Sequence, residues 1–436
     1  MPIPERPGPS CSASNTLSEI ETVKQTTRRT HCFGRTAFFA VFLVVSFGCT
    51  EDTPKPPAEN NVSSEESAVA APIPGPVNFA RGFDYASVPG ATLVTVRGPV
   101  RSWTKGGEPV QKEMQLVLEE QGFSAAALPS EWQGAVRVRV PVLRIAVNSQ
   151  AEEAFLSELG VKGRLVAVGG LKSYDAQIRT RVEKGEIRQV GYSWHSPPNM
   201  DVVVALDPDV FVMRLADLDH APSMDRLLEL GIPTIPYFID AEDTYLGRAE
   251  WIRFFGLLTG QLEVADRVFS GIQARTEAIR AEASRLASVP AMWAYPVGRD
   301  RWYAFVRGVE AELLEDAGGE NLLRRPDDAR QDPGIEIATE VIADRGRNAV
   351  VWIIGDIHAA EIPAFSGLAD IPAYRDGQLY SNDGRSIPEK DAYDLYELGF
   401  IRPDLLMRDL FAILHEPGEL SPDAYFRSVK DSSNTP

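Results

Sequence analysis

Arginine and aromatic residues recur in this chain where predicted strands end or loops begin. Arg214 follows the apolar run DVFVM, Arg307 follows RWYAFV, and Arg385 lies in YSNDGRS. Guanidinium groups form paired hydrogen bonds with carboxylates, and aromatic faces cover flat ligand surfaces. A cleft lined in this way would suit a bulky, partly anionic ligand, although each residue taken singly also fits a solvated surface or a core position. The candidate ligand-binding residues are Trp194, Arg214, Tyr245, Trp302, Tyr303, Arg307, Tyr380, Arg385 and Tyr393.

The familiar signatures of catalysis are missing from the sequence. It contains no G-x-S-x-G, H-E-x-x-H, G-x-x-x-x-G-K-[ST] or C-x-x-C motif. His195, His220, His358 and His415 are scattered singly, and a metal site would require His195 and His358 to converge with carboxylates. We therefore expect a binding protein rather than an enzyme, with no catalytic residues, no cofactor and no metal site.

The N-terminal region, residues 1–49, has the pattern of a bacterial secretory signal of the lipoprotein type. Arg28, Arg29 and Arg35 precede the apolar run AFFAVFLVVSFG, which ends at Cys49. That run is shorter than the roughly 20 apolar residues that span a bilayer. We expect cleavage before Cys49, lipidation of its thiol and an extracytoplasmic, membrane-anchored protein. An ordinary secretory signal or an uncleaved anchor is the alternative.

The composition after Cys49 excludes some classes of protein. Residues 50–76 are rich in Pro, Ser, Glu and Ala without an apolar period, which predicts a flexible tether. No cysteine follows Cys49, so a hydrophobic core rather than disulfide bonds must stabilise the chain. The net charge of -18 argues against nucleic-acid binding, which needs clustered Lys and Arg.

Alternation of apolar residues predicts an α/β fold with a β-rich N-terminal addition. Residues 77–134 alternate loosely and indicate short strands, which we expect to pack on the first lobe as an added edge. Residues 135–147 predict one strand that passes from half-exposed to fully buried. Helices are predicted at 151–159, 224–230, 247–258 and 402–415, and strands at 164–168, 209–213, 234–238, 292–295 and 349–354. Such alternation indicates parallel sheets covered by helices.

A long amphipathic helix divides this α/β region into two lobes. Apolar residues recur at three- and four-residue steps over 261–287, which gives one apolar face. We expect an N-terminal lobe at 135–260, a bridging helix at 261–288, and a C-terminal lobe with its terminal helix at 289–430. The two lobes echo each other, because Asp201 and Glu340 each open a predicted helix about one helix length before a buried strand.

Six segments, in order, resemble the substrate-binding lipoproteins of ABC importers for ferric siderophores, haem and cobalamin, the class III periplasmic binding proteins. They are RVPVLRIAVNSQAEEAFLSELGVKGRLVAVGG, MDVVVALDPDVFVM, LLELGIPTIPYF, YLGRAEWIRFFGLLTG, LLEDAGGENLL and RPDLLMRDLFAILHEPGELSPDAYFRSV. The resemblance extends from about residue 83 to 429. It implies two Rossmann-like lobes joined by a single long helix, with a ligand clamped between them.

The resemblance also implies partners. In that family one acidic residue per lobe meets arginine pockets of the membrane permease, and Asp201 and Glu340 hold those positions here. The expected function is capture of a ferric siderophore or similar metal chelate by a monomeric, lipid-anchored receptor. Cobalamin or haem is the alternative ligand, with Tyr192, His195 and His358 as the residues to examine for haem. A chelatase-like enzyme, or a sensor or adhesion protein on the same two-lobed fold, is the alternative function.

Overall fold

The computed structural model describes residues 71–102, 104–124, 128–192, 196–298, 300–325, 334–355 and 368–429. The predicted signal region with Cys49, most of the predicted tether, and Trp194, His195 and His358 lie outside the described residues.

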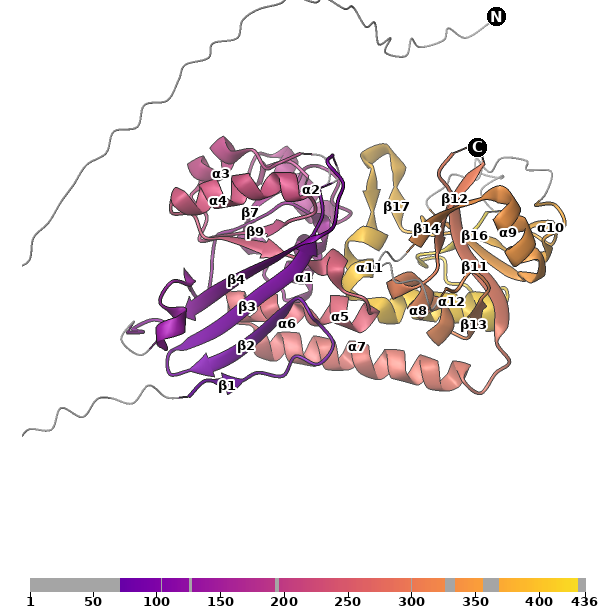
Figure 1. Ribbon diagram of the computed structural model, residues 1–436, viewed down its shortest axis with the longest axis horizontal. Coiled ribbons are helices and arrows are strands. Elements are labelled where there is room, and N and C mark those ends of the chain that lie inside the picture. Colours follow the sequence, from indigo (N-terminus) through magenta and orange to yellow (C-terminus); the bar gives the residue numbers. More distant parts are fainter. Residues whose placement is uncertain are drawn as a thin grey trace, which may run out of the picture. The chain divides into compact units, whose positions relative to one another are not determined.

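The N-terminal addition is a sheet of its own, with the strand order β1-β2-β3-β4-β5 (Figure 1). Strands β1 to β4 run antiparallel to their neighbours, whereas β5 pairs with β4 in parallel. Apolar residues alternate along β3, so one face of the sheet is buried. The prediction that this segment adds an edge to the sheet of the first lobe is therefore wrong. The segment forms a separate sheet that packs on the first lobe. The strands are β1 (Ile73–Pro74), β2 (Phe83–Val88), β3 (Ala91–Val100), β4 (Val110–Glu119) and β5 (Val136–Arg139).

The first lobe is built on a fully parallel sheet with the order β10-β9-β6-β7-β8. The run 135–147, predicted as one strand, is two strands in two sheets, because β5 ends at Arg139 and β6 starts at Ile145. The strands are β6 (Ile145–Val147), β7 (Leu165–Val168), β8 (Arg188–Gln189), β9 (Val210–Arg214) and β10 (Thr234–Tyr237). The helices are α1 (Gln150–Glu158), α2 (Ala176–Glu183), α3 (Met200–Leu206) and α4 (Ala221–Glu229).

Three helices lead from the first lobe to the second: α5 (Tyr245–Glu250), α6 (Ile252–Thr259) and α7 (Leu262–Ala283). The single helix predicted over 247–258 is thus two helices. Helix α6 ends at Gly260, whose positive φ of 68° suits glycine. Helix α7 ends at Ala283, four residues before the end of the apolar pattern predicted over 261–287. It packs against α6 at one end and against α8 and α12 of the second lobe at the other (Figure 1).

The second lobe has a mixed sheet in the order β14-β12-β11-β15-β16-β19, with β13 beside β11, and a small hairpin, β17-β18. Strands β11, β13, β15 and β16 are parallel, whereas β12, β14 and β19 run antiparallel to their neighbours. The strands are β11 (Val289–Pro296), β12 (Arg301–Phe305), β13 (Gly319–Asn321), β14 (Gly334–Ala338), β15 (Val351–Gly355), β16 (Leu379–Ser381), β17 (Ser386–Ile387), β18 (Ala392–Tyr393) and β19 (Arg427–Ser428). The helices are α8 (Gly308–Asp316), α9 (Thr339–Arg345), α10 (Pro372–Arg375), α11 (Leu398–Ile401) and α12 (Pro403–His415).

Two carboxylates attach the N-terminal sheet to the first lobe just before β2. Glu250 accepts hydrogen bonds from the backbone amides of residues 78–80, at 2.6–3.1 Å. Glu242 accepts from the amides of Arg81 and Gly82 and from the indole of Trp251. The ring of Phe83 then packs on Trp251, with centroids 4.9 Å apart. The sheet is therefore held by buried polar contacts as well as by its apolar face.

Candidate ligand-binding cavity

Two neighbouring cavities lie where strands of both lobes end. The larger has a volume of about 510 Å³ and the smaller about 230 Å³, and both are lined by Arg248, Tyr303 and Val309. The larger cavity is bounded by the residues that follow β9 and β10 and by β12 and the start of α8. In open α/β sheets, ligands bind beyond the carboxyl ends of the strands. The position of both cavities thus fits a ligand-binding site.

Aromatic rings form one wall of the smaller cavity. They come from β11, which carries Trp293 and Tyr295, and from β12, which carries Tyr303 and Phe305. Tyr303 lies with its centroid 5.4 Å from those of Tyr295 and Phe305, and Phe305 lies 5.6 Å from Trp293. Tyr396 and Phe400 add two further rings from the segment around α11. Such a wall offers flat apolar surface to aromatic groups of a ligand.

Charged side chains of both signs line the larger cavity. Three are cationic, Arg101, Arg248 and Arg307, and three are acidic, Asp240, Glu242 and Asp243. The acidic groups already have partners. Asp240 forms a paired ion pair with Arg214, at 2.8 and 2.5 Å. Glu242 holds the N-terminal segment, and Asp243 pairs with Arg81.

Three guanidinium groups line the same cavity beside these acidic groups. Arg248 is itself held by Glu310 at 3.2 Å and lies over the ring of Phe400. These contacts fix its guanidinium between the two cavities, since it lines both.

The structure brings three of the nine predicted ligand-binding residues to the cavities: Tyr245, Tyr303 and Arg307. Tyr245 donates a hydrogen bond to Asp316 at 2.7 Å, and burial raises its pKa above the ordinary value. Arg214 lies behind the larger cavity, where its ion pair orients Asp240. Trp194 lies outside the described residues.

Besides Arg214, four predicted residues of the described ranges line neither cavity. Trp302 is fully buried in the second-lobe core, beside Trp352, because neighbouring side chains of a strand point to opposite faces and Tyr303 takes the cavity side. Tyr380 is buried and donates to Gln378. Arg385 pairs with Asp394 at 2.6 Å, and Tyr393 lies in β18 of the hairpin.

Sequence reasoning missed Arg101, Arg248, Tyr295, Tyr396 and Phe400. Tyr295 had a usable signal, because it ends the strand predicted at 292–295. Arg101 directly follows β3, in a segment whose loose alternation gave no defined strand ends, and Arg248 lies inside α5, so only the fold brings both to the cavity.

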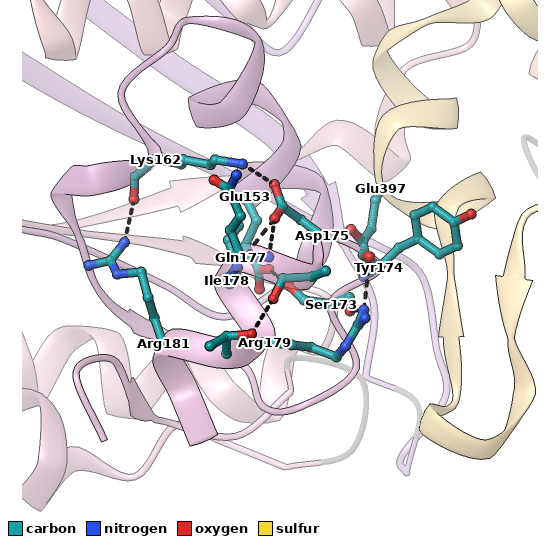
Figure 2. Close-up of polar contacts among 12 residues, drawn as sticks. Glu153, Lys162, Ser173, Tyr174, Asp175, Gln177, Ile178, Arg179, Arg181 and Glu397 are labelled. Atoms are coloured by element: carbon teal, nitrogen blue, oxygen red, sulfur yellow. Dashed lines mark hydrogen bonds and ion pairs between the residues drawn. The ribbon is translucent and has the colours of Figure 1, made fainter. Parts of the chain in front are cut away.

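A separate cluster of buried carboxyl groups lies where α1 and the β7–α2 connection meet the segment before α11 (Figure 2). Ser173 donates to Glu153, and the backbone amide of Tyr174 donates to Glu397. Burial, with a smaller contribution from the nearby Glu152, raises the pKa of Glu153 to about 8, and burial likewise raises the pKa of Glu397. Glu153 therefore holds a proton at neutral pH.

The N-terminus of α2 completes this cluster (Figure 2). Asp175 caps the helix by accepting from the amides of Gln177 and Ile178 at 2.8 and 3.2 Å, and Lys162 pairs with it at 2.5 Å. Arg179 donates to the carbonyl oxygens of Ser173 and Tyr174. Within the described ranges, no group of three or more His, Cys, Asp or Glu side chains is arranged to hold a metal ion.

The two acidic residues predicted for docking each lie near the start of a helix. Asp201 lies in the first turn of α3 and Glu340 in the first turn of α9, and both are exposed. A carboxylate there also interacts favourably with the helix dipole, which gives each residue a local stabilising role.

Two α/β lobes, a long connecting helix and a cavity between strand ends define a solute-binding protein of the two-lobed type. The family model described as periplasmic binding protein matches residues 145–385. The chain belongs to the periplasmic binding protein family, which comprises binding proteins rather than enzymes. The resemblance inferred from the six segments is thereby confirmed at the level of the family.

The chain is similar to proteins from several organisms. An uncharacterized lipoprotein of Methanocaldococcus jannaschii is 26% identical over 289 residues, which are 64% of this chain and 66% of the relative. The chain therefore spans just under two thirds of that relative's length. A periplasmic binding protein from Veillonella parvula is 12% identical, with a TM-score of 0.52 over 74% of this chain and 98% of that one. A periplasmic catecholate-siderophore binding protein from Vibrio cholerae is 14% identical, with a TM-score of 0.50 over 72% and 99%.

At these identities the solved structures establish the fold, and the confirmed fold class is α/β with parallel sheets. Among the helices of the described ranges, none combines the length and the apolar character needed to cross a bilayer.

Proposed function

We propose that this chain is an extracytoplasmic receptor, anchored by lipid on Cys49, that captures a ferric siderophore or similar metal chelate and delivers it to an ABC importer permease. Family membership supports the binding role, and the lipoprotein name of the relative supports the anchor.

One observation carries the choice of ligand: an aromatic wall stands next to a cavity lined by three arginines. Ferric tricatecholates present flat aromatic rings and a net negative charge on one compact complex. The wall of Tyr295, Tyr303 and Phe305 suits the rings, and Arg248 and Arg307 suit the charge.

Titration of the chain from Thr50 onward should give saturable, submicromolar binding of a ferric tricatecholate without turnover. Intrinsic tryptophan fluorescence is a suitable readout because Trp293 lines the smaller cavity. Arg307→Ala should weaken that binding about tenfold or more, since it removes a charge-assisted contact.

Arg301→Ala is the matched control, because Arg301 lies on β12 but pairs with Glu336 at the surface. The panel should also include a ferric trihydroxamate, haem and cobalamin. Binding of haem or cobalamin alone would replace the siderophore by the alternative ligand, and turnover of a metallated tetrapyrrole would favour the chelatase-like enzyme. No binding across the panel would overturn the proposal and favour a sensor or adhesion role.

Simultaneous reversal of Asp201 and Glu340 to arginine should impair uptake in cells while leaving ligand affinity unchanged. The reason is that exposed complementary charges mainly orient docking and speed association. Uptake of the radiolabelled chelate and its dissociation constant are the two measurements.

A control pair, Asp225→Arg with Glu336→Arg, changes the net charge equally at exposed positions. Loss of ligand binding in the Asp201 and Glu340 double variant, or equal uptake in both double variants, would refute the docking assignment.

A further inference from the structure

The N-terminal sheet reaches the larger cavity. Pro99 and Val100 at the end of β3, Arg101 directly after them, and Pro109 just before β4 all line it. These residues lie outside the range 145–385 that matches the family. The cavity is thus built from the two lobes and from a third element that the family match does not include.

A close backbone approach fixes the end of β3 against the first lobe. A Cβ atom on Gly98 would lie only 2.5 Å from Cγ of Phe238, so glycine is needed where the strand crosses this ring. Phe238 follows β10 and lines the same cavity. Strand β3 therefore helps to hold one of the cavity's own side chains in place.

Polar contacts fix the segment after β3. The amide of Leu218 donates to the carbonyl oxygen of Arg101 at 3.0 Å. Asp219 accepts from Ser102 at 3.2 Å and from Thr104, and pairs with Lys105 at 2.7 Å. These hydrogen bonds, with Lys105 the strongest contributor, lower the pKa of Asp219 to about 2. The backbone that carries Arg101 is therefore attached to the β9–α4 connection.

We propose that the N-terminal sheet is part of the ligand-binding site and that Arg101 makes the site selective for negatively charged chelates. The inference rests on the proposed function. Arg101 and Arg307 reach the same cavity from the N-terminal sheet and from the second lobe, so an anionic complex would contact cations from both. Planar guanidinium groups suit the paired oxygens of catecholate ligands.

The test compares two probes, a trianionic ferric tricatecholate and a neutral ferric trihydroxamate, on the chain from Thr50 onward. Arg101→Ala should weaken tricatecholate binding about tenfold and change trihydroxamate binding less than about threefold. Arg101→Lys should recover part of the loss, because lysine keeps the charge but not the paired hydrogen bonds. If the wild type binds only the tricatecholate, the inference is tested by the loss of tricatecholate affinity in Arg101→Ala alone.

Arg97→Ala is the matched control, because Arg97 lies on β3, four residues before Arg101, but pairs with Asp84 at the surface. Both alanine variants should melt at the wild-type temperature. Unchanged tricatecholate affinity in Arg101→Ala, or equal losses for both probes, would overturn this inference while leaving the proposed function intact. A wild type that binds neither probe nor any other chelate overturns the proposed function, and this inference with it.

Discussion

Replacement of Glu250 by alanine should destabilise the protein by about 3–5 kcal/mol. The side chain of Glu250 has no exposed surface and accepts the amides of Phe79 and Ala80 at 2.6 and 2.8 Å. It also pairs with Arg253, a buried guanidinium that lies over the ring of Phe269. The variant leaves these amides without their acceptor and removes one of the two carboxylates that pair with Arg253, since Asp266 remains at 2.7 Å.

Urea unfolding monitored by circular dichroism measures the change in the free energy of unfolding. Limited proteolysis adds a local readout, because cleavage near residues 78–82 should accelerate before the lobes are digested. Glu277→Ala, at an exposed position of α7, is the control and should change stability by less than about 0.5 kcal/mol. A loss below about 1 kcal/mol in Glu250→Ala would show that the apolar face alone holds the sheet.

The elements that the sequence predicted best are those with a long or repeated apolar pattern. The buried strand at Val210–Arg214 and the helix at Gln150–Glu158 lie within about two residues of their predicted bounds. Strand β9 is buried along its whole length, and a single window of sequence records this as a continuous apolar run. Boundaries were less predictable, as α7 shows: its apolar stripe continues past Ala283, but the helix ends there.

Residues of the candidate cavity were harder to predict because several elements supply them. Trp302 and Tyr303 are adjacent and both aromatic, yet only the direction of each side chain from β12 decides which faces the cavity. Arg101 precedes the first lobe in the sequence, whereas the three correctly predicted cavity residues all lie within the two lobes. Its place depends on Gly98 and Asp219, whose contacts are long-range and leave no local pattern.

The buried carboxyl cluster was also invisible to sequence reasoning. Glu152 and Glu153 occur in the first turn of α1, where acidic residues are ordinary because they favour the helix dipole. Their full burial, and the approach of Glu397 from a segment more than two hundred residues later, follow only from the packing of α11 on α1. The burial of Glu152 and Glu153 raises their pKa values and so makes the stability of the protein depend on pH.

The free energy of unfolding should fall as the pH rises from about 5 to about 9. Burial raises the pKa of Glu153 from 4.5 to about 8, with Glu152 and Asp175 adding to the increase, and burial raises the pKa of Glu152 to about 7. The native state therefore keeps protons that the unfolded chain releases above pH 4.5. The stabilisation is complete below that pH and is lost as the pH passes through about 8. For Glu153 alone the loss is at most about 5 kcal/mol.

Glu153→Gln should flatten this dependence, because the amide cannot ionise and still offers Ser173 an acceptor oxygen. Part of the slope should remain, since burial also raises the pKa of Glu312 to about 7 and of Glu397.

Urea unfolding at pH 5, 7 and 9 measures the slope, with Glu183→Gln at an exposed position of α2 as the control that should parallel the wild type. Groups with lowered pKa, such as Asp175 and Asp383, lose their stabilising charge only at lower pH and do not disturb this window. Equal slopes for the wild type and Glu153→Gln would mean that Glu153 is ionised in the native state throughout this pH range, which would contradict the prediction.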